Sequence, residues 1–505
     1  MAAAKKTPRA SSEKEKSRSI LSYFTPGRQP REGQKLALER IEKDWAKTDV
    51  FVVEIPTGGG KSDLALTLLR WASAQHKQKG MCIVPNNVLL QQYLDSNPRM
   101  ATIRGKHDYE CAHGSTELTG KMSCKEYSAK MGHTCKGVCP YTAANRKIRA
   151  VPYGVVNFYT YLAHRLYPDA LVIDEAHNLL GMLRDFAAKK LWQHVYQYPD
   201  YIRDYSSLLK WVKDKRFELQ DAGYPQDSKL EALYKDLNSG APKYLVEKGV
   251  DLHFGKEKSL LKLLPIDTSD QPPILWPNQV RKLILLSATI GPKDLEQLGL
   301  DGRRVSWIAT PSPIPPQNRP IVVQEPGLDL SYAGIQKELP NLLKEIGRIA
   351  DKHPGQRGIV HTTYSLMQAL GKEGIIQEGG RFLIHNKENK KEKYAEFLTG
   401  KSDAILICAG LYEGIDLPGD LGRFQIITKV PWPNLAEPAY KYLAQTDRDR
   451  YCYETLKTVM QGAGRVCRTP TDYGITYILD RTFQNIPEEL MPAWFRQALE
   501  AGETV

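Results

Sequence analysis

The chain has 505 residues and a formal net charge of +12, with 70 lysines and arginines against 58 acidic side chains, which is compatible with a polyanionic partner. Hydrophobic residues make up 41% of the chain and charged residues 25%, which is typical of a globular protein and excludes a largely disordered or fibrous one. No run approaches the ~18 apolar residues of a membrane span and no signal-peptide core is visible, so we expect no membrane association and an intracellular protein (cytoplasm, nucleoid or nucleus) that is not secreted.

The first part of the chain alternates strands and helices. Polar, lysine-rich residues 1–19 predict a disordered basic tail. An amphipathic run over 36–45 is followed by a buried strand at 50–55, a glycine turn and a helix over about 62–74. Further short apolar strands are predicted at 81–84, 171–173 and 283–286. This order predicts an α/β fold with a mostly parallel sheet.

The same alternation returns in the C-terminal half. Strands are predicted there at 358–361, 404–408, 424–428 and 475–479. Five prolines between Thr310 and Pro320 mark a junction between two α/β lobes. Two regions interrupt the first lobe, namely a cysteine-rich segment at about 102–150 and a stretch at about 178–278 that we expect to be helical.

A glycine-rich loop, PTGGGKS at 56–62, stands between the first strand and its helix. Backbone N–H groups of such a loop curl around phosphate oxygens. Lys61 would neutralise the charge of the β- and γ-phosphates, and the hydroxyl of Ser62 can bind Mg²⁺. The glycines concerned are Gly58, Gly59 and Gly60. The loop predicts a site for ATP.

Two further motifs fit the same site. Asp174, at the end of a strand, can hold Mg²⁺, and Glu175 can orient and deprotonate an attacking water. In the second lobe, QGAGRVCR at 461–468 supplies arginines that can stabilise charge on the transferring phosphoryl group when the lobes close. The polar residues concerned are Gln461, Arg465 and Arg468. An ordinary helix with surface arginines is the alternative, which the other two motifs disfavour.

The order and spelling of these motifs resemble superfamily 2 helicases and, more narrowly, a short form of the XPD/DinG family of iron–sulfur helicases. The resemblance runs from about residue 22 to 485. The sequence REGQ, which ends at Gln34, is similar to the adenine-reading Q motif of that family. Further segments resemble motif Ia (87–92), motif III (287–289), motif IV (361–365) and motif V (413–419). The resemblance implies that Gln34, Glu413 and Asp416 also bind the nucleotide.

Four of the eight cysteines are clustered, in the pattern C-x12-C-x10-C-x3-C. They are Cys111, Cys124, Cys135 and Cys139. Four thiolates suit a zinc ion or a [4Fe–4S] cluster. The flanking residues look like the family's borders around its cluster cysteines, so the resemblance implies [4Fe–4S], with zinc or four buried thiols as alternatives. We expect the remaining thiols to be non-ligands, namely Cys82, Cys408, Cys452 and Cys467.

The resemblance implies two RecA-like parallel-sheet motor lobes, with an iron–sulfur insertion and a helical arch-like insertion in the first lobe. The expected segments are the tail 1–19, lobe 1 (20–101, 151–177 and 279–310), the iron–sulfur insertion 102–150, the arch-like insertion 178–278 and lobe 2 (311–505).

The expected partners are single-stranded DNA and duplex junctions. Basic and aromatic side chains near the cysteines are candidate DNA contacts, namely Lys121, Lys125, Lys136, Arg146, Lys147, Arg149, Tyr127 and Tyr141. Residues 17–24, SRSILSYF, also resemble a sliding-clamp-binding peptide. The alternative is the Tyr-Phe pair that this family carries shortly before its Q-motif glutamine.

We therefore predict a monomeric ATP- and Mg²⁺-dependent DNA helicase that translocates on single-stranded DNA and uses its iron–sulfur domain as a wedge to unwind duplex. The 5′→3′ polarity is implied by the family resemblance alone. The alternatives are an RNA or RNA–DNA hybrid helicase, and an ATP-gated nucleic-acid-binding accessory protein that does not unwind.

Overall fold

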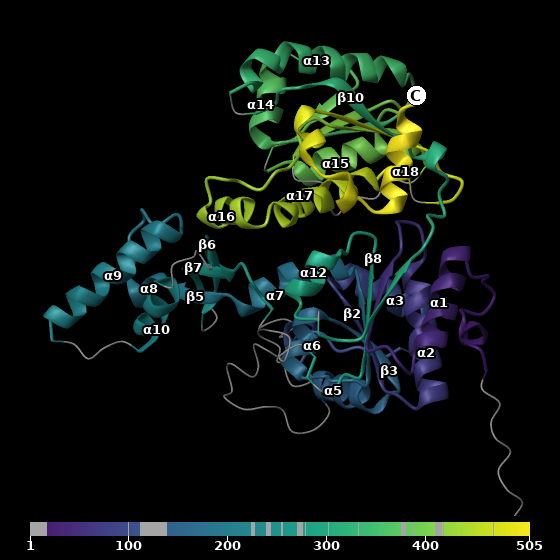
Figure 1. Ribbon diagram of the computed structural model, residues 1–505, viewed down its shortest axis with the longest axis vertical. Coiled ribbons are helices and arrows are strands. Elements are labelled where there is room, and N and C mark those ends of the chain that lie inside the picture. The colour runs from purple at the N-terminus through teal and green to yellow at the C-terminus, as the bar shows by residue number, and fades with distance from the viewer. Residues whose placement is uncertain are drawn as a thin grey trace, which may run out of the picture.

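Figure 1 shows the computed structural model, in which two α/β lobes lie one above the other and an extension projects from one side of the first lobe. The residues described by the structure are 18–98, 100–111, 139–223, 228–238, 244–253, 256–269, 276–277, 279–300, 302–331, 333–374, 380–386, 388–409, 417, 419–467 and 469–505. Among these residues no helix combines the length and the hydropathy that crossing a bilayer requires.

The first lobe is built on six parallel strands in the order β3-β2-β4-β8-β1-β9. Their bounds are β1 (Val50–Glu54), β2 (Gly80–Val84), β3 (Tyr153–Asn157), β4 (Ala170–Asp174), β8 (Lys282–Ser287) and β9 (Val305–Ala309). Helices cover both faces, which is why most of these strands are continuous apolar runs.

The helices of the first lobe divide between the two faces of its sheet. One face carries α1 (Glu32–Asp44), α2 (Lys61–His76) and α3 (Asn87–Ser96). The other carries α5 (Pro140–Ala150), α6 (Phe158–His164), α7 (Leu179–Ala187) and α12 (Pro292–Gln297). The predicted strands and the helix after the glycine turn are confirmed to within two residues.

The second lobe repeats this plan with the strand order β10-β15-β14-β11-β13-β12, again all parallel. Its strands are β10 (Ile321–Leu328), β11 (Gly358–Thr362), β12 (Phe382–Ile384), β13 (Ile405–Ala409), β14 (Phe424–Ile427) and β15 (Ile475–Asp480). One face packs on α13 (Ile335–Lys352) and α14 (Tyr364–Lys372), and the other on α15 (Lys390–Thr399), α17 (Arg448–Ala463) and α18 (Ala493–Gly502).

The expectation that 178–278 is helical is wrong in part. The extension holds α8 (Gln193–Tyr196), α9 (Tyr205–Asp221) and α10 (Ser228–Leu237), but it also holds an antiparallel sheet in the order β5-β7-β6. Its strands are β5 (Lys189–Trp192), β6 (Tyr244–His253) and β7 (Lys256–Pro265). In β7 the buried Leu261 and Leu263 flank Lys262, an alternation that fits a strand with one covered face. Alongside, α9 and β6 contact α16 (Pro438–Thr446) of the second lobe (Figure 1).

The first described residues pack on the first lobe. Ile20 and Phe24 are buried in its core, on either side of the short 3₁₀ helix Ile20–Tyr23. A sliding clamp would need these two side chains in solvent, so the burial argues against the clamp-binding hypothesis and fits the alternative of a family element before the Q motif. The basic tail expected at 1–19 lies outside the described residues up to residue 17.

Candidate active site

Three strand ends meet at one edge of the first sheet. In the parallel register Glu54 of β1 lies opposite Ser287 of β8, and Asp174 of β4 lies opposite Leu286. The carboxyl ends of neighbouring parallel strands form the usual ligand-binding edge of such sheets. Three segments therefore emerge side by side: the glycine-rich loop, the SAT segment (Ser287–Thr289) and the DEAH segment (Asp174–His177).

The glycine-rich loop has a backbone that side chains would disrupt. Gly58 and Gly60 adopt φ values of 78° and 82°, in the left-handed region that favours glycine. A Cβ on Gly59 would lie 2.5 Å from Cγ1 of Ile55, and one on Gly60 would lie 2.3 Å from Nε2 of Gln34. The loop is therefore tightly curled against its neighbours, with α2 beginning directly after it at Lys61.

Gln34, predicted to read adenine, holds this loop in place. Its side chain is almost fully buried, and its Nε2 donates a hydrogen bond of 2.8 Å to the carbonyl oxygen of Gly60. Its Oε1 accepts a bond of 2.8 Å from the backbone N–H of Arg31. Both ends of the amide are thus bonded to backbone, so Gln34 fixes the glycine loop relative to α1.

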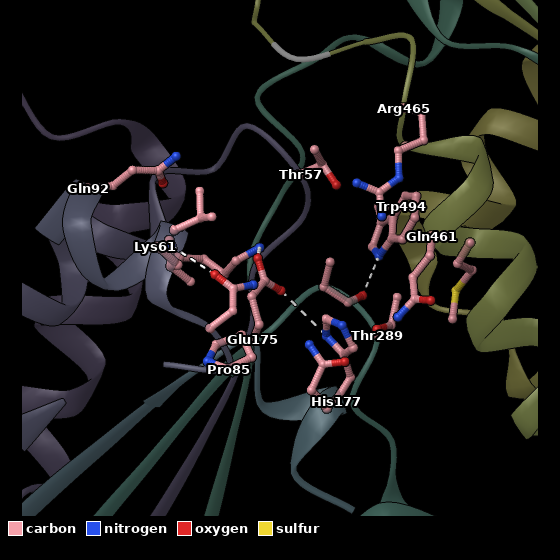
Figure 2. A pocket seen from close by; sticks show the side chains of 17 residues that line it. Thr57, Lys61, Pro85, Gln92, Glu175, His177, Thr289, Gln461, Arg465 and Trp494 are labelled. Carbon is pink, nitrogen blue, oxygen red and sulfur yellow. Dashed lines mark hydrogen bonds and ion pairs between the residues drawn. The ribbon is translucent and has the colours of Figure 1, made fainter. Parts of the chain in front are cut away.

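Lys61 and Glu175 form an ion pair of 3.0 Å at the centre of the site (Figure 2). Burial raises the pKa of Glu175, but the charge of Lys61 and its hydrogen bond to the carboxylate outweigh this effect, so the net pKa is lowered and the carboxylate is ionised. Oε2 of Glu175 lies 3.4 Å from Nδ1 of His177, which lies 3.0 Å from Oγ of Ser287. Burial lowers the pKa of His177 to about 4, so the imidazole is neutral at physiological pH.

Asp174 is buried beside this pair. Its Oδ2 accepts a hydrogen bond of 2.7 Å from the hydroxyl of Tyr93 on α3, and its Oδ1 accepts one of 2.9 Å from the backbone N–H of Glu175. Burial, with the neighbouring charge of Glu175, raises the pKa of Asp174 to about 6. A carboxylate whose charge is disfavoured in this way is suited to a divalent cation, which would offset the cost of burial.

The second lobe closes the other side of the site. Gln461 and Arg465, near the end of α17, line a cavity of about 380 Å³ together with Lys61 and Glu175 (Figure 2). A Cβ on Gly464 would lie only 3.0 Å from Oγ1 of Thr57 in the glycine loop, which shows how closely the lobes approach. The positive charge of Arg465 contributes to the lowered pKa values of Glu175 and His177. Arg468, Glu413 and Asp416 lie outside the described residues.

Two aromatic side chains of the second lobe hold the SAT segment. The hydroxyl of Tyr453 on α17 donates a hydrogen bond of 2.7 Å to the carbonyl oxygen of Thr289. The indole N–H of Trp494 donates one of 3.3 Å to the carbonyl oxygen of Ala288. These contacts join residues more than 160 positions apart, which is why the local sequence pattern did not reveal them.

A buried ion pair also joins the second lobe to the first, close to the SAT segment. Nζ of Lys457, one helical turn after Tyr453, lies 2.9 Å from Oδ1 of Asp294, and both side chains are buried. Oδ2 of Asp294 accepts a bond of 2.9 Å from the backbone N–H of Gly291, directly after the SAT segment. Since Ser287 contacts His177, α17 is connected to the Lys61–Glu175 pair through a continuous chain of polar contacts.

Only part of the predicted cysteine site lies within the described residues. Cys111 and Cys139, which are 28 positions apart, are both buried and form one small cluster with Tyr109 and Tyr141. Cys124 and Cys135 fall in the range 112–138, outside the part of the chain that the structure describes. Within the described ranges no group of three or more metal-ligating side chains comes together.

Two families match the chain. Residues 28–203 match the family described as "Type III restriction enzyme, res subunit", and residues 346–498 match that described as "Helicase C-terminal domain". The first range contains the glycine-rich loop and the DEAH segment, and the second contains Gln461 and Arg465.

Several curated proteins are similar to parts of the chain. A "Probable ATP-dependent helicase" of Methanocaldococcus jannaschii is 24% identical over 43% of this chain and 37% of its own length. "ATP-dependent DNA helicase YoaA" of Haemophilus influenzae is 26% identical over 28% of this chain and 24% of its own length. "ATP-dependent DNA helicase DDX11" of Mus musculus is 23% identical over 45% of this chain and 30% of its own length. The chain thus spans less than two fifths of the length of these relatives.

Solved structures resemble the whole fold. A structure titled "XPD_Helicase" superposes with a TM-score of 0.57 at 16% identity, covering 93% of this chain and 98% of that one. The structure of Xpd4 from S. tokodaii gives a TM-score of 0.55 at 15% identity, covering 91% and 99%. At these identities the likeness shows a shared fold.

Proposed function

Since the chain belongs to the XPD/DinG-like superfamily 2 helicases, we propose that it is an ATP-dependent DNA helicase that moves along single-stranded DNA and separates duplex strands. The observation that carries the proposal is the cavity between the lobes, where Lys61 and Glu175 of one lobe face Gln461 and Arg465 of the other. A site divided in this way links hydrolysis to lobe movement.

We infer that the Lys61–Glu175 ion pair is the arrangement of the site before the nucleotide binds. When ATP enters, Lys61 would exchange Glu175 for the β- and γ-phosphates, over which the glycine loop presents its backbone N–H groups. The released carboxylate of Glu175, no longer paired with Lys61, can orient a water for attack on the γ-phosphorus and accept its proton. Nucleotide binding itself would thereby free the residue that hydrolysis needs.

The second lobe supplies the complementary charge. Arg465 would stabilise the negative charge that spreads over the transferring phosphoryl group, and Gln461 would help to position the attacking water. Both side chains approach the phosphates only when the lobes close, because Gln461 lies in α17 of the second lobe and Arg465 follows the end of that helix. Hydrolysis and release would then reopen the cleft and advance the strand by one step.

Ser62 and Asp174 are the residues that would hold Mg²⁺. The bound ion would neutralise charge on the β- and γ-phosphates. The buried carboxylate of Asp174, with its raised pKa and the donor bond from Tyr93, is the feature of this structure that fits such a role.

For the cysteine segment we propose a [4Fe–4S] cluster held by Cys111, Cys124, Cys135 and Cys139, with zinc as the alternative. The burial of Cys111 and Cys139 in one cluster supports a shared ligand, because these two thiols are distant in sequence. Bound there, the cluster would stiffen a small domain that acts as the wedge between the two DNA strands. Cys139→Ser should lower the iron and sulfide content of anaerobically purified protein and abolish unwinding, while ATP binding is retained.

The proposed substrate is DNA, because relatives such as YoaA and DDX11 are named DNA helicases. We propose 5′→3′ movement of a monomer on single strands and at duplex junctions inside the cell. Anaerobically purified protein should separate duplexes with a 5′ tail more readily than those with a 3′ tail. Preference for RNA or hybrid duplexes would overturn the DNA assignment, and translocation without strand separation would favour an accessory role.

Arg465→Ala tests the division of the active site. We expect ATP turnover with single-stranded DNA to fall by about 10³-fold, the lower end of what such arginines contribute, with nucleotide binding retained. Arg281→Ala is the matched control because that arginine is largely exposed on the first lobe. Wild-type turnover in the Arg465 variant would contradict the proposed mechanism.

A further inference from the structure

The second sheet has a cavity of its own at the carboxyl ends of its strands. Its volume is about 690 Å³, and it lies beyond β10, β15, β14 and β11, which are neighbours in the sheet. Each of these strand ends contributes a lining residue, namely Leu330, Asp480, Lys429 and Thr363. Strand ends of this kind are where α/β sheets bind ligands, and this edge is separate from the site on the first sheet.

Two stacked aromatic rings form one wall of this cavity. The rings of Trp432 and Tyr451 lie 5.4 Å apart and are inclined by only 19°. The indole N–H of Trp432 donates a hydrogen bond of 2.9 Å to Oγ1 of Thr482, and the hydroxyl of Tyr451 donates one of 2.8 Å to the carbonyl oxygen of Pro433. Both rings are thus held in place where they line the cavity, so they offer an aromatic surface to a flat ligand.

The charges around the cavity favour an anion beside that flat group. Lys429 and Arg448 line it, and Asp480 is the single carboxylate among its described lining residues. Asp480 is buried and accepts hydrogen bonds of 2.9 Å from the backbone N–H groups of Val430 and Thr482. Its charge is therefore engaged by the protein, and the cavity as a whole is basic and aromatic.

The cavity is mechanically connected to the nucleotide site by one helix. Arg448 and Tyr451 lie in the first turn of α17, and Gln461 lies in its last turn, with Arg465 directly after it. Gln461 lies thirteen positions after Arg448 in this helix, which corresponds to about 20 Å at 1.5 Å per residue. A ligand held at the first turn of α17 would thus move with the arginine that acts on ATP.

We propose that this cavity receives one unstacked base of a single-stranded nucleic acid, which packs against the Trp432–Tyr451 wall while its phosphates contact Lys429 and Arg448. The inference rests on the proposed helicase function and deepens it. Base stacking on an aromatic ring accepts any sequence, as a translocating protein requires, and the basic side chains follow the backbone. The cavity would grip the strand during each movement of α17.

The experiment measures the affinity for a fluorescent single-stranded oligonucleotide at several salt concentrations. Trp432→Ala should weaken binding by about 5- to 150-fold, since one stacked base contributes about 1–3 kcal/mol. The slope of log affinity against log salt should not change, because no phosphate contact is lost. The double variant Lys429→Ala/Arg448→Ala should instead reduce that slope by about 1.4, at about 0.7 per phosphate contact.

Tyr473→Ala is the matched control. Tyr473 is 47% exposed and lies under the guanidinium of Arg423 at 4.0 Å, but it precedes β15 and therefore belongs to the opposite edge of the same sheet. Its loss should leave affinity unchanged. Trp432→Phe keeps a ring in the wall, so it should fold normally, restore most of the affinity and lose part of the tryptophan fluorescence quenching that binding causes.

The outcomes separate the two levels of the proposal. A wild-type protein that binds no single strand would overturn the helicase function and the cavity together. Wild-type binding that is equally strong in Trp432→Ala, or equal quenching in the wild type and Trp432→Phe, would overturn the cavity assignment alone. A loss in Trp432→Ala at unchanged salt slope, with Tyr473→Ala unaffected, would establish it.

Discussion

The two lobes share a six-stranded parallel sheet but place different chemistry at its carboxyl edge. At the first sheet, Glu175 lies 3.0 Å from Lys61 and 3.4 Å from His177, and the charges of Lys61 and Glu175 balance one another. At the second, Trp432 and Tyr451 form an aromatic wall beside Lys429. The first edge is suited to phosphate chemistry and the second to holding a flat base.

The difference arises in the loops and not in the sheets. A glycine loop after β1 brings backbone N–H groups inward, whereas a proline-containing loop after β14 (Val430–Pro433) presents a rigid indole. Among the helices and strands that the structure describes, α17 alone lines both regions, because it contributes Tyr451 to one edge and Gln461 to the other. A common scaffold can therefore be specialised by its connections, and one helix can make the two specialisations interdependent.

The largest expected effect comes from removing the cation of the first edge. In Lys61→Ala the γ-phosphate loses its main neutralising charge, so we expect ATP turnover to fall by at least about 10³-fold, the upper end of what one lost charge-stabilising group costs and no less than the loss expected for Arg465→Ala. Phosphate release with single-stranded DNA measures this, with the exposed Lys35→Ala as control. Near-normal turnover would break the assignment of phosphate chemistry to the first lobe.

The next largest effect concerns the ion pair between the lobes. Lys457→Met leaves the buried carboxylate of Asp294 without its partner, which should lower the free energy of unfolding by about 3–5 kcal/mol. Urea denaturation measures the loss, and the double variant Asp294→Asn/Lys457→Met should recover part of it. If the two single effects simply add in the double variant, the pair does not couple the lobes.

A smaller effect is expected within the first edge. Tyr93→Phe removes the hydroxyl that donates to Asp174, and a buried bond to a charged group contributes about 1.5–3 kcal/mol. The matched control is Tyr159→Phe, whose hydroxyl donates to Asp185 at an exposed position and should matter by less than about 0.5 kcal/mol. Equal losses of unfolding free energy in both variants would show that burial of Asp174 does not strengthen its bond.

The smallest effect concerns how the free energy of unfolding depends on pH, to which His361 of the second lobe contributes. Burial lowers its pKa in the folded protein to about 4, below the ordinary value, so the unfolded chain takes up the proton first. The stability is complete above about pH 6.5 and falls as the pH drops toward 4, by up to about 1.4 kcal/mol per pH unit. His361→Asn should flatten this slope in urea titrations at pH 5 and pH 7, whereas an unchanged slope would assign it to other groups.

Much of the nucleotide site could be predicted because its signals are local. The glycine loop, Asp174 and Glu175 each follow an apolar strand directly, so short sequence windows contain both the element and the chemistry. The two parallel sheets could be predicted for the same reason, since buried strands are short apolar runs. Edge strands were harder to predict, and β12 has only three partly buried residues.

What could not be predicted depends on contacts between distant residues. From the sequence, Tyr93 is indistinguishable from an ordinary core residue of a helix. Its hydrogen bond to Asp174 forms because α3 packs beside β4. Lys457 and Asp294 each look like a surface charge until the lobes bury them against one another. The sheet of the side extension had a local signal in the alternation around Lys262, but the prediction of a helical stretch over 178–278 did not take this signal into account.

The strand that precedes the glycine loop, β1, is synthesised long before the strands with which it pairs. β1 ends at Glu54. Its two neighbours in the sheet come more than 200 residues later in the chain, since β8 ends at Ser287 and β9 at Ala309. At synthesis rates of about 5–20 residues per second, its two edges would wait roughly 10–50 s on the ribosome before either partner is complete. The nascent chain therefore exposes an unpaired apolar strand for nearly half of its synthesis, a period in which chaperone binding would protect it from aggregation.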